Sequence, residues 1–201
     1  MDQGSNGRER LLNYRTTPDC MPHLLDEKNV QMLTGHKVFS KAELKSRCEI
    51  MLENYCKTVL IEANTMIDMA KTEIAPAVSA YVLELANTAA AKKAVDASIS
   101  CSYEAGLLKK LARLEDQIAV KADELDDAVM KIKDAGDIES ESYMIRDVVL
   151  SKMGELRVAC DEAETMTAKK ILAIPNLWRF TVWRKITYQQ ERTLAYFHLI
   201  R

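Results

Sequence analysis

Apolar residues recur at steps of three and four between residues 44 and 74. That spacing keeps them on one face of an α-helix. The stripe consists of Leu44, Cys48, Met51, Tyr55, Val59, Ala63, Met66, Ala70 and Ile74. Ser40 and Glu43 precede it in the arrangement of a capping box, in which the serine hydroxyl accepts from the glutamate N–H and the carboxylate reaches back to the serine N–H. The pattern predicts a long amphipathic helix that starts after Ser40.

Pro76 falls within this helical pattern, yet apolar spacing resumes at Val78, Val82 and Leu85. Proline lacks a backbone donor and crowds the preceding turn. We therefore expect a kinked helix or two abutting helices here. The segment 95–102 is predicted to be a connection.

Two further long helices are predicted after that connection. The inner face of the first is formed by Leu107, Leu111, Leu114, Ile118, Leu125, Val129 and Ile132, and Gly136 is expected to end it. Its other face is densely charged, which is typical of a solvated surface with local ion pairs. The next helix is predicted from Ile138 to Lys169 and presents Ile145, Val148, Val149, Met153, Leu156, Cys160 and Ala163. A shorter helix is expected at 26–34, with Gly35 taking a left-handed C-cap conformation.

The composition agrees with long helices, because 201 residues include only six glycines and four prolines. Three long amphipathic segments with short connections should pack antiparallel. The sequence predicts an all-α fold: an antiparallel bundle of about three long helices with coiled-coil character, plus a short N-terminal helix. The expected organisation is an irregular lead-in over 1–22, the bundle over 23–170 and a distinct tail over 171–201.

Charge and cysteine usage exclude several function classes. The net charge of −2 gives no electrostatic case for nucleic acid binding. The five cysteines form no CxxC pair and are interpreted as reduced cytosolic thiols that fill helix faces: Cys20, Cys48, Cys56, Cys101 and Cys160. No signal peptide is expected, and no stretch approaches the ~20 apolar residues of a membrane span. We expect a cytoplasmic protein with neither a membrane nor a nucleic acid partner.

The sequence shows no recognisable active site. Neither of the common phosphate-binding glycine loops occurs, and His23, His36 and His198 are far apart and have no metal-ligand spacing. Glu62 and Asp68 lie in an otherwise apolar stretch, where we expect them to pair with Lys or Arg across the bundle. The methionines Met51, Met66 and Met69 are interpreted as core. No catalytic, cofactor-binding or metal-ligating residue is predicted.

Several passages resemble the C-terminal region of type III glutamine synthetases. Residues 17–30, with Thr17-Pro18-Asp19-Cys20-Met21-Pro22-His23-Leu24 and Glu27-Lys28-Asn29-Val30, resemble the TxDALPxL…EKxV passage that follows the catalytic domain in that family. Residues 61–70 contain Ile61-Glu62-Ala63 and Thr65-Met66-Ile67-Asp68-Met69-Ala70, which is similar to its IEAxTMxDMA passage. The resemblance covers about residues 11–170 in register.

The tail 171–201 is aromatic and basic and has a single acid, Glu191. This composition alone would favour a membrane-surface or nucleic acid role. However, permissible codons for 171–182 read one base out of step give Tyr-Trp-Pro-Phe-Pro-Thr-Tyr-Gly-Asp-Leu-Leu-Phe, which is similar to the family's own ending, and a stop follows at Ile186. Residues 1–10 can likewise be shifted into a family-like passage. We interpret both ends as frameshifted; a codon other than ATA at Ile171 would refute this for the tail.

The resemblance implies a helical C-terminal domain without the chemistry of the enzyme. Intact relatives join ammonia to glutamate with ATP and divalent metals, and the glutamate, nucleotide and metal sites lie upstream of this region in a β-rich catalytic domain. This chain is therefore expected to hold no cofactor and to be inactive alone, with the synthetase catalytic domain or a second copy as partner. The alternatives are a helical self-association or scaffold module that packs on a synthetase, and a non-functional pseudogene remnant.

Overall fold

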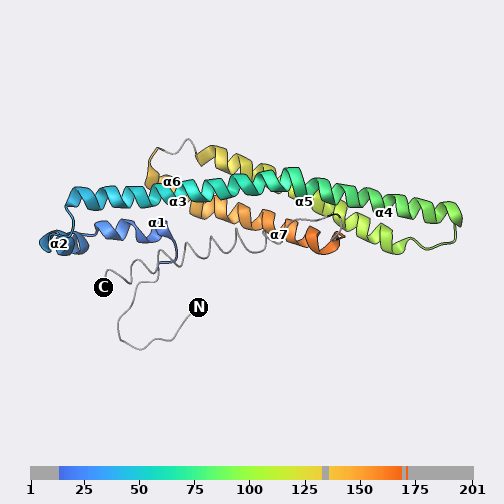
Figure 1. Ribbon diagram of the computed structural model, residues 1–201, viewed down its shortest axis with the longest axis horizontal. Helices are drawn as coiled ribbons and strands as arrows, with labels where there is room; N and C mark the ends of the chain where they lie inside the picture. Colours follow the sequence, from blue (N-terminus) through green and yellow to red (C-terminus); the bar gives the residue numbers. More distant parts are fainter. Residues whose placement is uncertain (1–13, 133–135, 169–170, 172–201) are drawn as a thin grey trace, which may run out of the picture.

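The computed structural model describes residues 14–132, 136–168 and 171, and the regular elements within these residues are all helical (Figure 1). Three long helical segments run antiparallel, as predicted, and a short N-terminal part packs at one end. The elements in order are α1 (Thr17–Cys20), η1 (Pro22–Leu25), α2 (Glu27–Gly35), α3 (Lys41–Met69), η2 (Ala70–Ile74), α4 (Ala75–Val95), α5 (Ser102–Ile132), α6 (Ile138–Met144), η3 (Ile145–Val149) and α7 (Leu150–Met166). The predicted all-α bundle is confirmed.

The start of α3 has the predicted capping box. The Ser40 hydroxyl accepts from the Glu43 N–H at 3.2 Å, and the Glu43 carboxylate accepts from the Ser40 N–H at 2.7 Å. Two orphan backbone donors of the first turn are thereby satisfied. These bonds also lower the pKa of the Glu43 carboxyl.

The end of α2 differs from the prediction. The left-handed residue is Lys37, with φ of 55°, and not Gly35, which is the last residue of the helix. The Lys37 N–H bonds to the Thr34 carbonyl and the Val38 N–H to the Leu33 carbonyl, each at 3.0 Å. This pair of bonds is a Schellman motif, which closes the helix two residues later than the glycine suggested.

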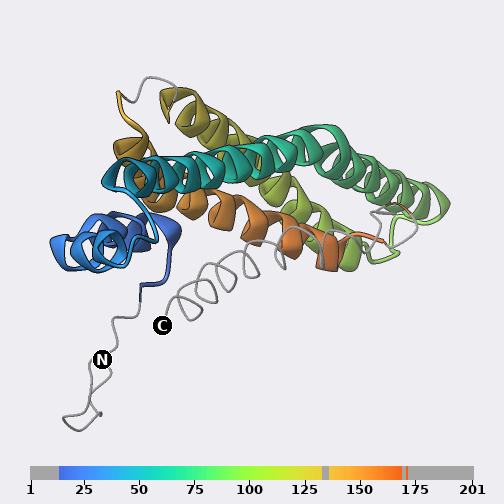
Figure 2. The ribbon, with the colours of Figure 1, turned by 60° about the vertical axis from the view of Figure 1, so that its left-hand side comes forward.

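The long helical segment is continuous through Pro76 and changes direction between α3 and α4, as predicted for a kinked helix (Figure 2). The chain passes from α3 through the π-helical turn η2 directly into α4, with Pro76 in its first turn (Figure 1). A π-turn inserts one extra residue and shifts the backbone bonds to i→i−5, as the bond from the Ala75 N–H to the Ala70 carbonyl shows. The missing donor and the ring of Pro76 are thus accommodated where a regular helix would clash.

One large core joins α3, η2, α4, α5, η3 and α7. Most of the predicted inward residues are buried, but the stripe on α3 is displaced near its middle: Met51 is exposed, whereas Leu52 and Cys56 are buried. Leu52 packs in a second, smaller cluster with residues of the N-terminal segment. In this part of α3 the buried face is therefore wide, because the helix packs both on the bundle and on the N-terminal segment.

The third long segment also contains a π-turn. Within η3, Ile145 and Val149 are fully buried, while Val148 is exposed, contrary to the prediction. The extra residue of the turn rotates Val148 out of the core. The segment ends at Met166, three residues before the predicted Lys169, which lies outside the described residues. Residues 133–135 are also outside them, so the end of α5 is described only to Ile132.

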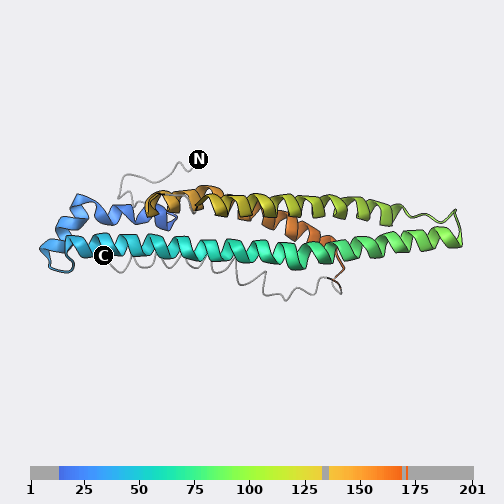
Figure 3. The same cartoon turned by 90° about the horizontal axis from the view of Figure 1, so that it is seen from above.

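The N-terminal lead-in is more regular than predicted. Its described part forms the short α1 and the 3₁₀ turn η1, both packed at the Lys41 end of the bundle (Figure 3). The predicted tail 171–201 lies outside the described residues except for Ile171, and so does the predicted shifted frame over 1–10.

At the opposite end, α4 and the first part of α5 continue beyond the end of α7 as a two-helix projection (Figure 3). We call residues 76–108 the distal arm. One 18-residue stretch of the continuous helix Lys41–Val95 has a mean hydropathy of 1.2 and passes, by length and composition alone, as a candidate membrane span; 17% of it is buried. The expectation that no stretch approaches such a composition is therefore wrong for this helix.

Candidate docking site of the N-terminal segment

The N-terminal segment, residues 14–25, is seated on a small core of its own. Cys20 and Met21 pack with Cys48 and Leu52 of α3. The Cys48 thiol donates to the Met21 carbonyl at 3.3 Å. Sulfur-rich side chains fill such irregular gaps well because they are small or flexible. The segment is thus fixed by burial to the first half of α3.

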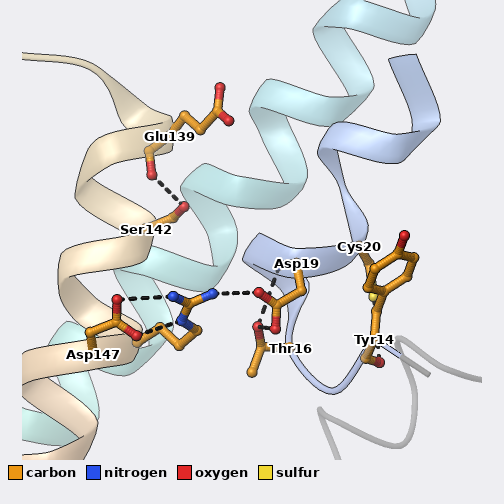
Figure 4. Close-up of polar contacts among 8 residues, drawn as sticks. Tyr14, Thr16, Asp19, Cys20, Glu139, Ser142 and Asp147 are labelled. Atoms are coloured by element: carbon orange, nitrogen blue, oxygen red, sulfur yellow. Dashed lines mark hydrogen bonds and ion pairs between the residues drawn. The ribbon is translucent and has the colours of Figure 1, made fainter. Parts of the chain in front are cut away.

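A polar cluster fixes the same segment to the third helical segment. Thr16 caps α1 and donates its hydroxyl to the Asp19 carboxylate at 2.6 Å. The other oxygen of Asp19 accepts from Arg146, which is 127 residues later in the chain. Arg146 also donates to both Asp147 oxygens, at 2.7 and 2.9 Å, and its guanidinium lies 4.9 Å from the centre of the Tyr143 ring. Figure 4 shows Asp19 and Asp147 on either side of that guanidinium. We call these five residues the Arg146 cluster.

The π-turn η3 places Arg146 in this position. Ile145 and Val149 anchor the turn in the core, and the two residues between Ile145 and Val148, Arg146 and Asp147, point towards α1 and solvent. The hydrogen bonds that Arg146 donates to Asp147 raise the pKa of Arg146; the nearby Asp19 raises it further, and desolvation opposes both. The guanidinium in turn lowers the pKa of Asp147. Arg146 and Asp147 are therefore both charged at neutral pH, which strengthens the hydrogen bonds between them.

Two further polar groups on the neighbouring elements are buried, the Ser142 side chain on α6 and the Tyr55 hydroxyl on α3. The Ser142 side chain is fully buried and donates to the Glu139 carbonyl at 2.7 Å (Figure 4). The Tyr55 hydroxyl is buried without a hydrogen-bond partner among the described residues. Burial raises the pKa of Tyr55, so its phenol stays neutral.

Elsewhere the long helices are joined by exposed ion pairs. Lys71 bonds to Asp123 at 2.8 Å and Asp126 at 3.3 Å, and Lys121 bonds to Glu155 at 2.8 Å. Each such pair contributes about 0–1 kcal/mol, so they set register more than stability. Asp68, predicted to pair across the bundle, is exposed and forms no ion pair within 14–132 and 136–168, so that prediction is wrong for Asp68.

The described residues show no arrangement suited to catalysis. No group of three His, Cys, Asp or Glu side chains within them could hold a metal ion. His23 bonds to Asp26 at 3.0 Å and stacks on Tyr14, and His198 lies outside the described residues. The thiols are free, and all but Cys101 are buried. Burial raises the pKa of Cys56 and Cys160 to about 12, so these thiols fill the core and are poor nucleophiles at neutral pH.

Reasoning from the sequence missed the Arg146 cluster. Asp19 lies in one of the family-like passages, but no spacing rule joins it to a residue 127 positions later. The Arg146 cluster therefore has a structural role: it holds the N-terminal segment in a fixed position and orientation on the bundle.

Substituting Arg146 with alanine should lower the free energy of unfolding by about 1–2 kcal/mol, because Asp19 loses a charge-assisted bond in a contact where the two side chains are only 26% and 31% exposed. Chemical denaturation followed by circular dichroism measures this. The matched control is Lys45→Ala, which removes an exposed pair with Glu49 at 3.8 Å and should cost a few tenths of a kcal/mol. Equal effects of the two substitutions would show that the Arg146 cluster does not hold the segment.

Comparison with known proteins shows sequence similarity to glutamine synthetases. Residues 5–93 match the glutamine synthetase C-terminal domain family. A glutamine synthetase of Butyrivibrio fibrisolvens is 33% identical over 167 residues, covering 83% of this chain and 24% of the relative. A type-3 glutamine synthetase of Dictyostelium discoideum is 25% identical over 170 residues, covering 83% and 23%, and a glutamine synthetase of Bacteroides fragilis is 22% identical over 173 residues, covering 84% and 24%. The chain spans about a quarter of the length of these curated relatives.

Proposed function

Since this chain belongs to the glutamine synthetase family through its C-terminal domain, we propose that it is the C-terminal helical part of a type III glutamine synthetase. The observation that carries this proposal is the coverage. More than four fifths of the chain aligns with less than a quarter of each relative, one of which is named a type-3 enzyme.

The proposed role is to dock against the remainder of such a synthetase. The Arg146 cluster and the small core around Cys20 and Leu52 fix residues 14–25 to the bundle. Because residues 14–25 are fixed, a chain that connects them to an upstream domain would reach the bundle from one direction only. The bundle would then be held in a defined orientation on that domain, which a flexible linker could not achieve.

The same proposal makes the isolated chain inactive. Glutamine formation through a phosphorylated glutamate needs metal ions and cationic groups placed around the transferred phosphoryl group. We place those groups, together with ATP and divalent metal, in the upstream part of an intact cytoplasmic enzyme. The alternatives of a scaffold module and of a pseudogene remnant differ from this in the outcome of a replacement experiment.

The experiment replaces the matching region of the Butyrivibrio fibrisolvens glutamine synthetase with residues 11–170 of this chain. We expect the chimera to form glutamine from glutamate, ammonia and ATP, while the relative lacking that region and the isolated chain do not. Activity of the chimera no greater than that of the deletion would contradict the proposal.

Two variants of the chimera separate docking from mere chain length. Leu156→Asp places a charge in the fully buried core and should abolish the recovered activity. Val158→Asp changes a side chain that is 67% exposed on the same helix and should retain it. Equal activity of the two variants would show that the folded bundle is not what the synthetase requires.

A further inference from the structure

The outer face of α4 is unusual for a surface helix because it is almost free of charge. Residues 75–91 include one charged side chain, Glu84, whereas the chain average of 29% would give about five. Leu83 is 62% exposed there, and Val95 and Tyr103 near the tip of the distal arm are also exposed. Solvated helix faces are normally charged or polar, so this composition indicates a face that is covered in the working protein.

Among the residues that the structure describes, the distal arm is also not covered by a third helix as the rest of the bundle is. In Figures 1 and 3, α4 and α5 pass beyond the end of α7 and are paired only with each other over the described residues there. A two-helix hairpin leaves both of its broad sides open. The low charge of α4 therefore coincides with the place where the described residues supply no cover.

From these observations we propose that the distal arm is a self-association surface, on which α4 of a second copy of this chain packs antiparallel to α4 of the first.

The exposed stripe of α4 is self-complementary in that arrangement. Leu83, Asn87, Ala90 and Ala94 are all exposed and lie within about 60° of one another around the helix. Antiparallel pairing about a two-fold axis between Thr88 and Ala89 places Leu83 opposite the partner's Ala94, and Asn87 opposite the partner's Ala90. A large side chain then meets a small one at both ends of the contact, and no charge lies on the stripe.

The small residues permit the close approach that such packing needs. Helix axes come within about 8 Å of each other where alanines line the contact. Two arms about 25 Å long and 20 Å wide would bury about 1,000 Å² in total, the lower limit of specific interfaces. We therefore expect a weak dimer, with a dissociation constant in the micromolar range.

The length of the molecule indicates that the partner packed on the exposed face of α4 is another copy of the chain. Of the arguments for self-association, only this one rests on the proposed function. The continuous helix of 55 residues is about 80 Å long, and the N-terminal segment enters at its Lys41 end. The remaining roughly 500 residues of a relative would form a body about 60 Å across. Such a body, joined at the Lys41 end, does not extend to the tip of the distal arm.

A lipid surface fits the same face less well. Two of the four residues of its exposed stripe are alanines, and Asn87 lies in the middle of the stripe. An interfacial helix would carry bulky apolar residues on one side and lysine or arginine on the other. Binding to vesicles is therefore an outcome that would overturn the proposal.

The test is the mass of the full chain in solution, measured by sedimentation equilibrium over a range of micromolar concentrations. We expect a concentration-dependent rise from 22.7 kDa towards twice that mass. Leu83→Glu should weaken the dimer at least tenfold, and Val158→Glu, at a similarly exposed site on α7, should leave it unchanged. Circular dichroism checks that each variant is folded.

A complementation variant makes the test specific to the antiparallel register. Ala94→Lys should also disrupt the dimer, because two lysines would each face an apolar Leu83. A mixture of the Leu83→Glu and Ala94→Lys chains should restore association, since the introduced carboxylate then faces the ammonium group introduced in the partner. The proposal would be overturned if the chain stays monomeric at every concentration, or if Leu83→Glu leaves the dimer intact. It would also be overturned if the mixture of variants does not associate, or if the chain co-sediments with anionic vesicles and forms no dimer. These outcomes leave the activity of the chimera unaffected, so the two proposals fail separately.

Discussion

Deletion of Thr72 should lower the free energy of unfolding by about 3 kcal/mol, because it removes the extra residue of η2 and leaves Pro76 within a regular α-helix. Thr72 is exposed, so the deletion removes no core contact. The loss would come from the clash of the proline ring with the preceding turn and from the missing backbone donor. Urea denaturation monitored by far-UV circular dichroism measures the change.

The same deletion in a Pro76→Ala background should be close to neutral, within about 1 kcal/mol of the intact chain. A π-turn absorbs one residue, so its removal returns a regular helix without rotating α4 against α3. Pro76→Ala alone should likewise have a small effect, because η2 already accommodates the ring. If deletion of Thr72 is as harmful in the Pro76→Ala background as in the intact chain, the π-turn is not what reconciles Pro76 with the core.

The second large effect is expected at Leu156, where truncation to alanine should cost about 2–5 kcal/mol. Leu156 is fully buried between α7 and α5, and a close-packed site recovers little of the lost volume. Thermal and urea unfolding should both move to milder conditions. Denaturant slopes that remain unchanged would assign the loss to the native core.

Val158→Ala supplies the control on the same helix. Its side chain is two residues away and largely solvated, so the change should stay within about 0.5 kcal/mol. Comparable losses at the two positions would mean that α7 does not present the face described for it.

The long helices could be predicted from the sequence because the evidence for them is local. Ser40 and Glu43 fix a helix start through bonds three residues apart, and the stripe that follows needs only a helical period. The fold class follows, since three such stripes have to be buried against one another. The spacing of the stripe gave no signal for η2. Three successive buried steps of four span η2 at Met66, Ala70, Ile74 and Val78, but the same spacing occurs at Leu44, Cys48, Leu52 and Cys56 within the regular helix α3.

The details that escaped prediction depend on partners distant in the chain. Leu52 is buried in place of Met51 because the N-terminal segment returns to pack there. The Arg146 cluster requires α1, η3 and α6 to meet, and neither Asp19 nor Arg146 has a neighbour in sequence that points to the other. The low density of charge on α4 did not by itself identify an open face, because only the early end of α7 shows that nothing within the described bundle covers it.

The contact between Asp19 and Arg146 has a consequence for the order of folding. Helix hairpins such as α4–α5 bring together residues that are close along the chain, so their loop-closure entropy is small and they form early. The ends of the Asp19–Arg146 contact are 127 residues apart. It gains its full strength only when η3 already lies against α3. We therefore expect the N-terminal segment to dock last in refolding and to open first in native-state hydrogen exchange, with amides of residues 17–25 exchanging before those of α5.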